Sequence, residues 1–193
     1  MKQFTTTFLI ITTLLFGVLG FGQTSLEAGD LALLQYNSDG STETIKILVL
    51  KSLEANTTFS FTDKGYHSVD GFTGNGNNEN TQTYTATSAI KCGEIISIDL
   101  VGLVLAANGD QIFLYQGAVG TPTFIFGLNV SGSSGTWQAN RTNNSNSAIP
   151  STLTNGINSV ALPHIDNYKY NGPLVGNKST ILTAICDKIN WIG

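Results

Sequence analysis

Charged side chains are scarce in this sequence, since Asp, Glu, Lys and Arg together make up 11% of its 193 residues. Globular domains usually carry about 25%, so solubility must rest on uncharged polar residues such as Asn, Ser, Thr and Gly. The formal net charge is -4, and the basic residues are scattered singly along the chain. This distribution lacks the electrostatic footprint of a nucleic-acid-binding protein. The composition is typical of an extracellular β-protein.

Long apolar runs are also missing, apart from one near the N-terminus. The run over residues 8–19 is apolar except for two threonines, follows the positive Lys2, and ends in small residues. This pattern predicts a secretory signal peptide over residues 1–22. A transmembrane anchor would need about 20 apolar residues, which is more than this run has. We therefore expect export, no membrane span after signal removal, and a single domain over residues 23–193.

Cysteine is rare, and the exported part holds only Cys92 and Cys186. An oxidising compartment permits a disulfide, and an even number of cysteines is its usual signature. We therefore predict a bridge between Cys92 and Cys186 that ties the end of the domain to its middle. Two separate buried thiols are the alternative. Two distant cysteines are too few for a zinc site.

Short apolar or alternating runs recur along the chain, with turn residues between them. The runs expected to form strands cover residues 30–36, 45–50, 57–62, 82–86, 95–100, 111–115, 123–128 and 159–162. One helix is expected near the end, capped by Ser179 or Thr180. Its apolar face would consist of Ile181, Leu182, Ile185 and Ile189. Together these elements predict a mainly β fold, an antiparallel β-sandwich with one C-terminal helix. A partly open barrel is the alternative.

Two long stretches, residues 65–80 and 131–151, are too rich in Gly, Asn and Ser for regular structure. Long loops in a compact domain are often functional. The side chains in them best suited to contact a ligand are Tyr66, His67, Phe72 and Trp137. We therefore predict a ligand-binding surface on these loops. The alternative is that the aromatic rings pack the loops onto the sandwich, because Trp and Tyr are usually largely buried.

No set of residues specifies a chemistry. Asp63 and Asp70 flank an aromatic loop, as the carboxylates of a glycosidase would, but aspartate is also an ordinary turn residue. No G-x-S-x-G motif occurs, and His67 and His164 lie in polar segments. The aspartates at predicted strand ends lack a calcium-loop pattern. We therefore expect no catalytic residue, no metal and no cofactor.

Several segments resemble one family. These segments are Gly29-Asp30-Leu31-Ala32, Tyr36-Asn37-Ser38-Asp39, residues 61–66, residues 109–117, Leu153-Thr154-Asn155-Gly156 and Tyr170-Asn171-Gly172-Pro173. Together they are similar to an uncharacterised β-rich domain of secreted proteins from Bacteroidetes-type bacteria, found as the front module of larger multidomain proteins. The resemblance covers nearly all of the exported part. It implies a secreted or cell-surface location and carries no catalytic residue with it.

Composition, loops and resemblance together favour a secreted, non-enzymatic binding or adhesion module. Its ligand is expected to be an extracellular glycan or a surface protein. An extracellular hydrolase and a structural matrix component are the alternatives. A pocket with converging carboxylates would favour the hydrolase, whereas loops around an open groove would favour binding.

Overall fold

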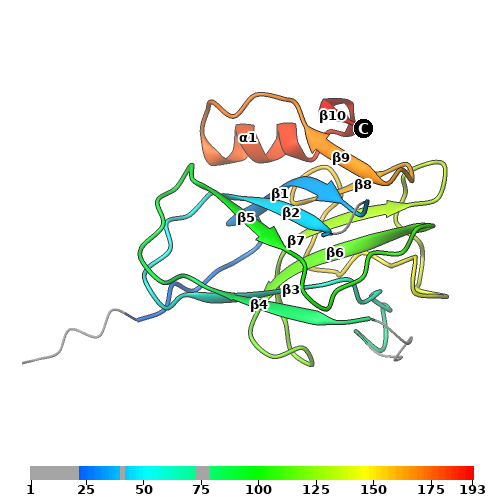
Figure 1. Ribbon diagram of the computed structural model, residues 1–193, viewed down its shortest axis with the longest axis horizontal. Coiled ribbons are helices and arrows are strands. Elements are labelled where there is room, and N and C mark those ends of the chain that lie inside the picture. Colours follow the sequence, from blue (N-terminus) through cyan, green and yellow to red (C-terminus); the bar gives the residue numbers. More distant parts are fainter. Residues whose placement is uncertain (1–21, 40–41, 73–78) are drawn as a thin grey trace, which may run out of the picture.

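Two five-stranded sheets face each other in a computed structural model that describes residues 22–39, 42–72 and 79–193 (Figure 1). The β1 sheet has the order β10 (Trp191–Ile192), β9 (Asn167–Tyr170), β1 (Leu31–Asn37), β2 (Thr44–Val49) and β5 (Ile95–Asp99). The β6 sheet has the order β4 (Thr81–Thr85), β3 (Thr58–Thr62), β6 (Gly109–Gln116), β7 (Thr123–Ser131) and β8 (Ser159–Leu162). The predicted β-sandwich is therefore confirmed. The predicted signal peptide lies outside the described residues except for Gly22.

The alternation of apolar and polar residues explains how the sandwich forms. In β3, Phe59 and Phe61 are 1% and 0% exposed, and Ser60 between them points away from the core. In β2, Ile45 and Ile47 are fully buried opposite Ile98 and Ile96 of β5. Since successive side chains of a strand point to opposite faces, these strands each give one apolar row to the main core. Every predicted strand is present, and its ends differ from the prediction by at most three residues.

Three features of the strands were not predicted. The strand β8 pairs with β7 in parallel, so the sheets are not purely antiparallel. The long connection over residues 132–158 allows this, because a parallel pair needs a crossover and cannot be joined by a tight turn. The strands β9 and β10 were missed because they span four and two residues and depend on pairing with β1 and with each other.

The predicted helix is present as α1 (Lys178–Ile185), but its ends differ from the prediction. Its N-cap is Asn177, whose side chain accepts the backbone N–H of Thr180. Ile189 lies beyond the helix in the short 3-10 helix η1 (Lys188–Asn190) and is 80% exposed, so it is not part of the apolar face. Within the described residues, no helix is both long and apolar enough to cross a membrane.

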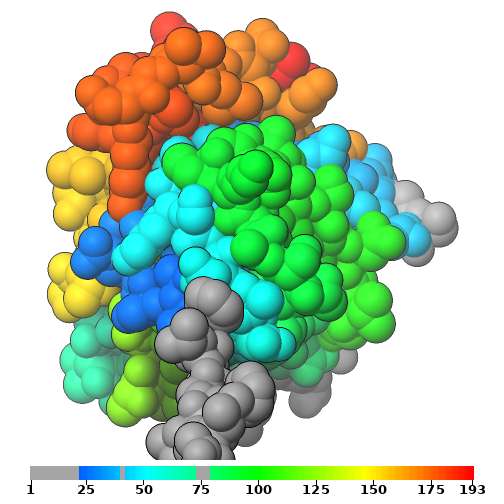
Figure 2. All heavy atoms as spheres, turned by 90° about the vertical axis from the view of Figure 1, so that its left-hand side faces the viewer, coloured from blue at the N-terminus to red at the C-terminus, as the bar shows by residue number. Residues whose placement is uncertain are grey.

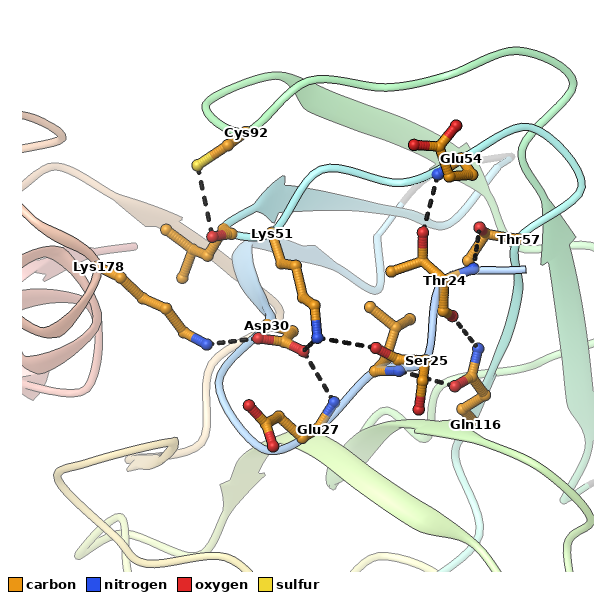
Figure 3. A network of polar contacts seen from close by, with 12 residues as sticks. Thr24, Ser25, Glu27, Asp30, Lys51, Glu54, Thr57, Cys92, Gln116 and Lys178 are labelled. Carbon is orange, nitrogen blue, oxygen red and sulfur yellow. Dashed lines mark hydrogen bonds and ion pairs between the residues drawn. The ribbon is translucent and has the colours of Figure 1, made fainter. Parts of the chain in front are cut away.

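A buried aspartate joins α1 to the rest of the sandwich. Asp30 is 1% exposed, and its carboxylate binds Lys178 of α1, Lys51 at 3.2 Å and the backbone N–H of Glu27 (Figure 3). Burial alone would raise the pKa of Asp30, but these hydrogen bonds together hold the pKa below its ordinary value. Figure 2 shows the first described residues, in blue, beside the orange C-terminal region and beside cyan residues. The network therefore fastens three distant segments together.

The predicted disulfide between Cys92 and Cys186 is absent, because both cysteines are free thiols. Cys92 lies exposed in the turn before β5, where its thiol contacts the carbonyl oxygen of Leu50 at 3.4 Å (Figure 3). Cys186 is the buried C-cap of α1, and its sulfur receives the backbone N–H of Ser159 in β8. The two thiols thus face different neighbours at different strands.

The two thiols should differ in reactivity. Burial raises the pKa of Cys186 to about 12, and the thiolate is the reactive form. We expect a thiol reagent to modify Cys92 rapidly in the folded protein and Cys186 only after unfolding. Titration with and without denaturant measures this. If titration of the unfolded, unreduced protein found no free thiol, the structure would be contradicted and the predicted disulfide between Cys92 and Cys186 would be supported.

Candidate functional site

The strand β6 is apolar on both faces, which is unusual for a sandwich strand. Ile112 and Leu114 point into the main core, whereas Phe113 and Tyr115 point outward. Both outward rings are buried nevertheless, at 0% and 2% exposure. They form an outer cluster, which consists of Phe113, Tyr115, Phe124, Leu153, Tyr66, Phe72 and Trp137 with Ala28 and Ile149. A strand buried on both faces requires a cover on each, and the two long loops supply it here.

The loop after β3 brings Tyr66 and Phe72 onto the outer cluster. The ring centroid of Tyr66 lies 5.7 Å from that of Phe72 and 5.4 Å from that of Phe124, both edge to face. Phe72 and Phe124 are 5.3 Å apart. Aromatic pairs at these separations attract one another beyond the area that they bury. The rings of Tyr66 and Phe72 are half-buried, so each is partly packed and partly accessible.

Backbone hydrogen bonds hold this loop in place. The N–H of Tyr66 donates to the hydroxyl of Ser147 at 2.8 Å, and its carbonyl accepts the N–H of Ala148 at 3.0 Å. His67 and Gly71 exchange two backbone hydrogen bonds of 2.9 Å. Gly65 is required because a Cβ there would lie 2.7 Å from the carbonyl oxygen of Asn146. The two long loops therefore support each other.

An open cleft of about 450 Å³ lies beside these rings. Its apolar wall consists of Tyr66, Phe72 and Phe124. The rest of its lining includes Asp70, Val119, Pro122, Pro150, Ser151 and Thr152. The polar groups of Asp70, Ser151 and Thr152 are exposed to solvent. Ligand sites in proteins commonly combine apolar walls with a few polar groups that fix orientation, and this cleft has that composition.

The other two predicted ligand-binding residues do not line the cleft. His67 is not in its lining, and its Nδ1 lies 3.3 Å from the carboxylate of Asp70 on the rim. Trp137 stacks on Phe113 at 5.6 Å and donates from Nε1 to Asn155 at 3.2 Å. Its ring fits because Gly127 has no side chain; a Cβ there would lie 3.2 Å from the indole. Tyr66 and Phe72 are therefore brought together, His67 supports the rim, and Trp137 packs the second loop.

Three acidic side chains form a carboxyl cluster where the first loop leaves and rejoins the β6 sheet. Burial raises the pKa of Asp63 to about 6, although the N–H of Asn80 donates to this carboxyl at 2.7 Å. Burial, and then the neighbouring Asp63, raise the pKa of Glu79 to about 7. Burial also raises the pKa of Asp110 well above its usual range. None of the three lines the cleft.

The amide of Gln111 connects this carboxyl cluster to the second loop. Its nitrogen donates to Asp110 at 2.7 Å, to the carbonyl oxygen of Asn144 at 2.9 Å, and to that of Asp63. Gln111 is fully buried. The carboxyl cluster and Gln111 together therefore anchor the bases of both loops that border the cleft.

The suggested acid pair of Asp63 and Asp70 does not form one site. Asp63 is 1% exposed and belongs to the carboxyl cluster, whereas Asp70 lies on the rim of the cleft. Among the described residues, no three His, Cys, Asp or Glu side chains come together as metal ligands. The sequence reasoning missed Phe124, Val119 and Ser151, although the double-sided apolar pattern of β6 could have indicated the covered face.

No family model, curated protein or solved structure matches this chain. The resemblance to a secreted bacterial module therefore stays a prediction.

Proposed function

We propose that this chain is an exported, non-enzymatic module that binds carbohydrate in the cleft beside Tyr66 and Phe72. The observation that carries the proposal is the wall of partly accessible aromatic rings next to exposed hydroxyl and carboxylate groups. Sugars have apolar C–H faces that pack on aromatic rings and hydroxyls that need hydrogen-bonding partners. The Tyr66 and Phe72 rings would take the first role, and Asp70 with Ser151 and Thr152 the second.

The residues that line this cleft favour a binding site over a glycosidase active site. A glycosidase of the usual kind needs two carboxyl groups about 5–10 Å apart across the sugar bond. Among the described residues that line the cleft, Asp70 is the one carboxylate. The acids with raised pKa values lie in the carboxyl cluster at the bases of the loops and not in the cleft. They are Asp63, Glu79 and Asp110. This arrangement supports binding over a hydrolase.

A blocking substitution tests the proposal without disturbing the packed rings. Val119 lines the cleft and is 47% exposed, so arginine at this position can fill the cleft at little cost in stability. The protein should bind at least one immobilised neutral oligosaccharide based on glucose, galactose, mannose or N-acetylglucosamine. Val119→Arg should weaken that binding at least about tenfold, equivalent to about 1.4 kcal/mol.

The matched control is Val101→Arg, at a position that is 76% exposed and outside the cleft. It adds the same charge and volume and should bind like the unaltered protein. Failure of the unaltered protein to bind any of these oligosaccharides would defeat the carbohydrate proposal. Equal binding by the two variants would show that the ligand occupies another surface.

A further inference from the structure

The outer face of the β1 sheet is only partly covered. Its outward Leu34 and Leu48 are 6% and 3% exposed, and α1 with the segment before it lies on this side of the sheet (Figure 1). Leu182 of α1 lies against Gly29, just before β1. Toward the end of β1 and the start of β2, the outward residues are polar and half-buried. They are Gln35, Asn37, Thr44 and Lys46. This part of the face, the open half, is therefore only partly covered.

Two lysines flank a glutamine on this open half. Gln35 of β1 is paired directly with Lys46 of β2 on one side and with Lys169 of β9 on the other. Directly opposed side chains lie on the same face of a sheet. With neighbouring strands about 4.8 Å apart, the lysine Cα atoms are about 10 Å apart. A groove of about 240 Å³ runs over this row and has Leu34, Ile95 and Tyr170 among its walls.

Neither lysine is used by the fold. Lys51 and Lys178 both bind Asp30, and Lys64 donates to a carbonyl oxygen. Among the described residues, Lys46 and Lys169 make no ion pair, and no carboxylate lines their groove. On this face, Asp99 of β5 lies opposite Thr44 and diagonal to Lys46, but it forms no ion pair with that lysine. The row is thus a positive site on an acidic protein.

We propose that this groove binds an acidic polysaccharide, with Lys46 and Lys169 each pairing with an anionic group along its chain. Gln35 lies between them and can hydrogen-bond sugar hydroxyls. Ile95 and Leu174 in the same lining are 49% and 40% exposed, and these apolar side chains suit the apolar faces of sugar rings. The site lies on the opposite face of the sandwich from the cleft at Tyr66, so it does not depend on that proposal.

An acidic peptide fits this groove less well. Extended peptides commonly bind by adding a strand to a free sheet edge. Here β1 is hydrogen-bonded to β2 and to β9 on its two sides, so its backbone is already paired. Recognition at Gln35 must therefore use side chains alone. Regularly spaced anionic groups on a sugar chain match such a row of side chains.

The test compares two variants with equal charge change. One is Lys46→Gln with Lys169→Gln, and the control is Lys91→Gln with Lys188→Gln, two exposed lysines outside the groove. Polygalacturonate offers carboxylates, dextran sulfate offers sulfates, and unmodified dextran has neither. We expect binding to at least one of the two acidic polymers, weakened by added salt and absent with dextran. The Lys46/Lys169 variant should lose at least about tenfold in affinity.

The control variant should retain its affinity, and so should Val119→Arg, which separates this site from the cleft. An equal loss in the Lys91/Lys188 variant would show that net charge alone matters and would overturn the proposal. Binding of poly-glutamate as tight as that of the acidic polysaccharide would also overturn the proposal, because it would favour an acidic protein partner. Failure to bind either acidic polysaccharide would overturn it as well. Unchanged circular dichroism and melting temperature would show that the exposed lysine variants remain folded.

Discussion

Replacing Phe113 with alanine should destabilise the protein by about 4 kcal/mol, a large share of the stability of an ordinary domain. Phe113 is fully buried, although it points away from the main core. Its ring contacts those of Tyr66, Phe72, Phe124 and Trp137, at centroid distances between 5.6 and 6.5 Å. Truncation therefore leaves a cavity at the point where both long loops rest on the sheet. Denaturant unfolding measures the loss.

The control for this variant is Val101→Ala, at an exposed position, where a change within about 0.5 kcal/mol is expected. The Phe113 variant should also be cut faster by proteases within residues 136–153, because that loop loses the surface on which Trp137 stacks. A cost below about 1 kcal/mol would mean that the outer cluster does not pack as a core. The aromatic wall of the cleft would then lack a firm support.

Local sequence patterns were enough to predict most of the sandwich. Strict alternation located β3 and β5, and turn residues bounded the strands closely. The strand β9, which reads Asn-Tyr-Lys-Tyr, was missed because four residues form a strand only when β1 lies beside them. Ile189 shows the opposite error, because it continues the helical spacing after the helix has ended at Ile185.

The candidate site depended more strongly on tertiary contacts. The loop composition drew attention to Tyr66 and Phe72, which line the cleft, but nothing local could separate them from Trp137, which packs on Phe113 and does not line it. The predicted disulfide was wrong for a related reason. An even number of cysteines says nothing of distance, and here the thiol of Cys92 contacts Leu50, just after β2, whereas that of Cys186 contacts Ser159 of β8. Such outcomes are decided by how segments far apart in the sequence meet.

Stability should rise as the pH is lowered from about 8 to about 5, the reverse of ordinary acid denaturation. The reason is the carboxyl cluster at the loop bases. The pKa of Glu79 is raised from 4.5 to about 7 and that of Asp63 from 3.8 to about 6, in both cases chiefly by burial. Lys64 and Arg141 favour the ionised form of Glu79 but do not outweigh its burial and the repulsion from Asp63.

The sign follows from proton binding. Between about pH 4.5 and pH 7 the folded protein holds protons on these carboxyls that the unfolded chain has released, so unfolding is harder at the lower pH. The pKa shift of Glu79 alone corresponds to about 3 kcal/mol at about 1.4 kcal/mol per unit. Asp30 acts in the other direction, because its pKa is lowered. Its contribution is lost only as the pH falls through that lowered pKa, below the window of the carboxyl cluster.

Glu79→Gln should flatten this dependence, because the amide keeps an oxygen that can accept the backbone N–H of Gly65 but carries no charge at any pH. Near pH 8 the variant should be more stable than the unaltered protein by about 2 to 3 kcal/mol. The difference should fall below about 1 kcal/mol by about pH 5 and vanish below about pH 4. Glu54→Gln, at an exposed position, removes the same charge and should change neither the stability nor its slope. Denaturant unfolding at a series of pH values measures the stability of all three proteins.

A stability that rises with pH between about pH 5 and pH 8 would mean that the carboxyls are ionised in the folded state. The loop bases would then need compensating positive charge near Glu79 beyond what Lys64 and Arg141 supply.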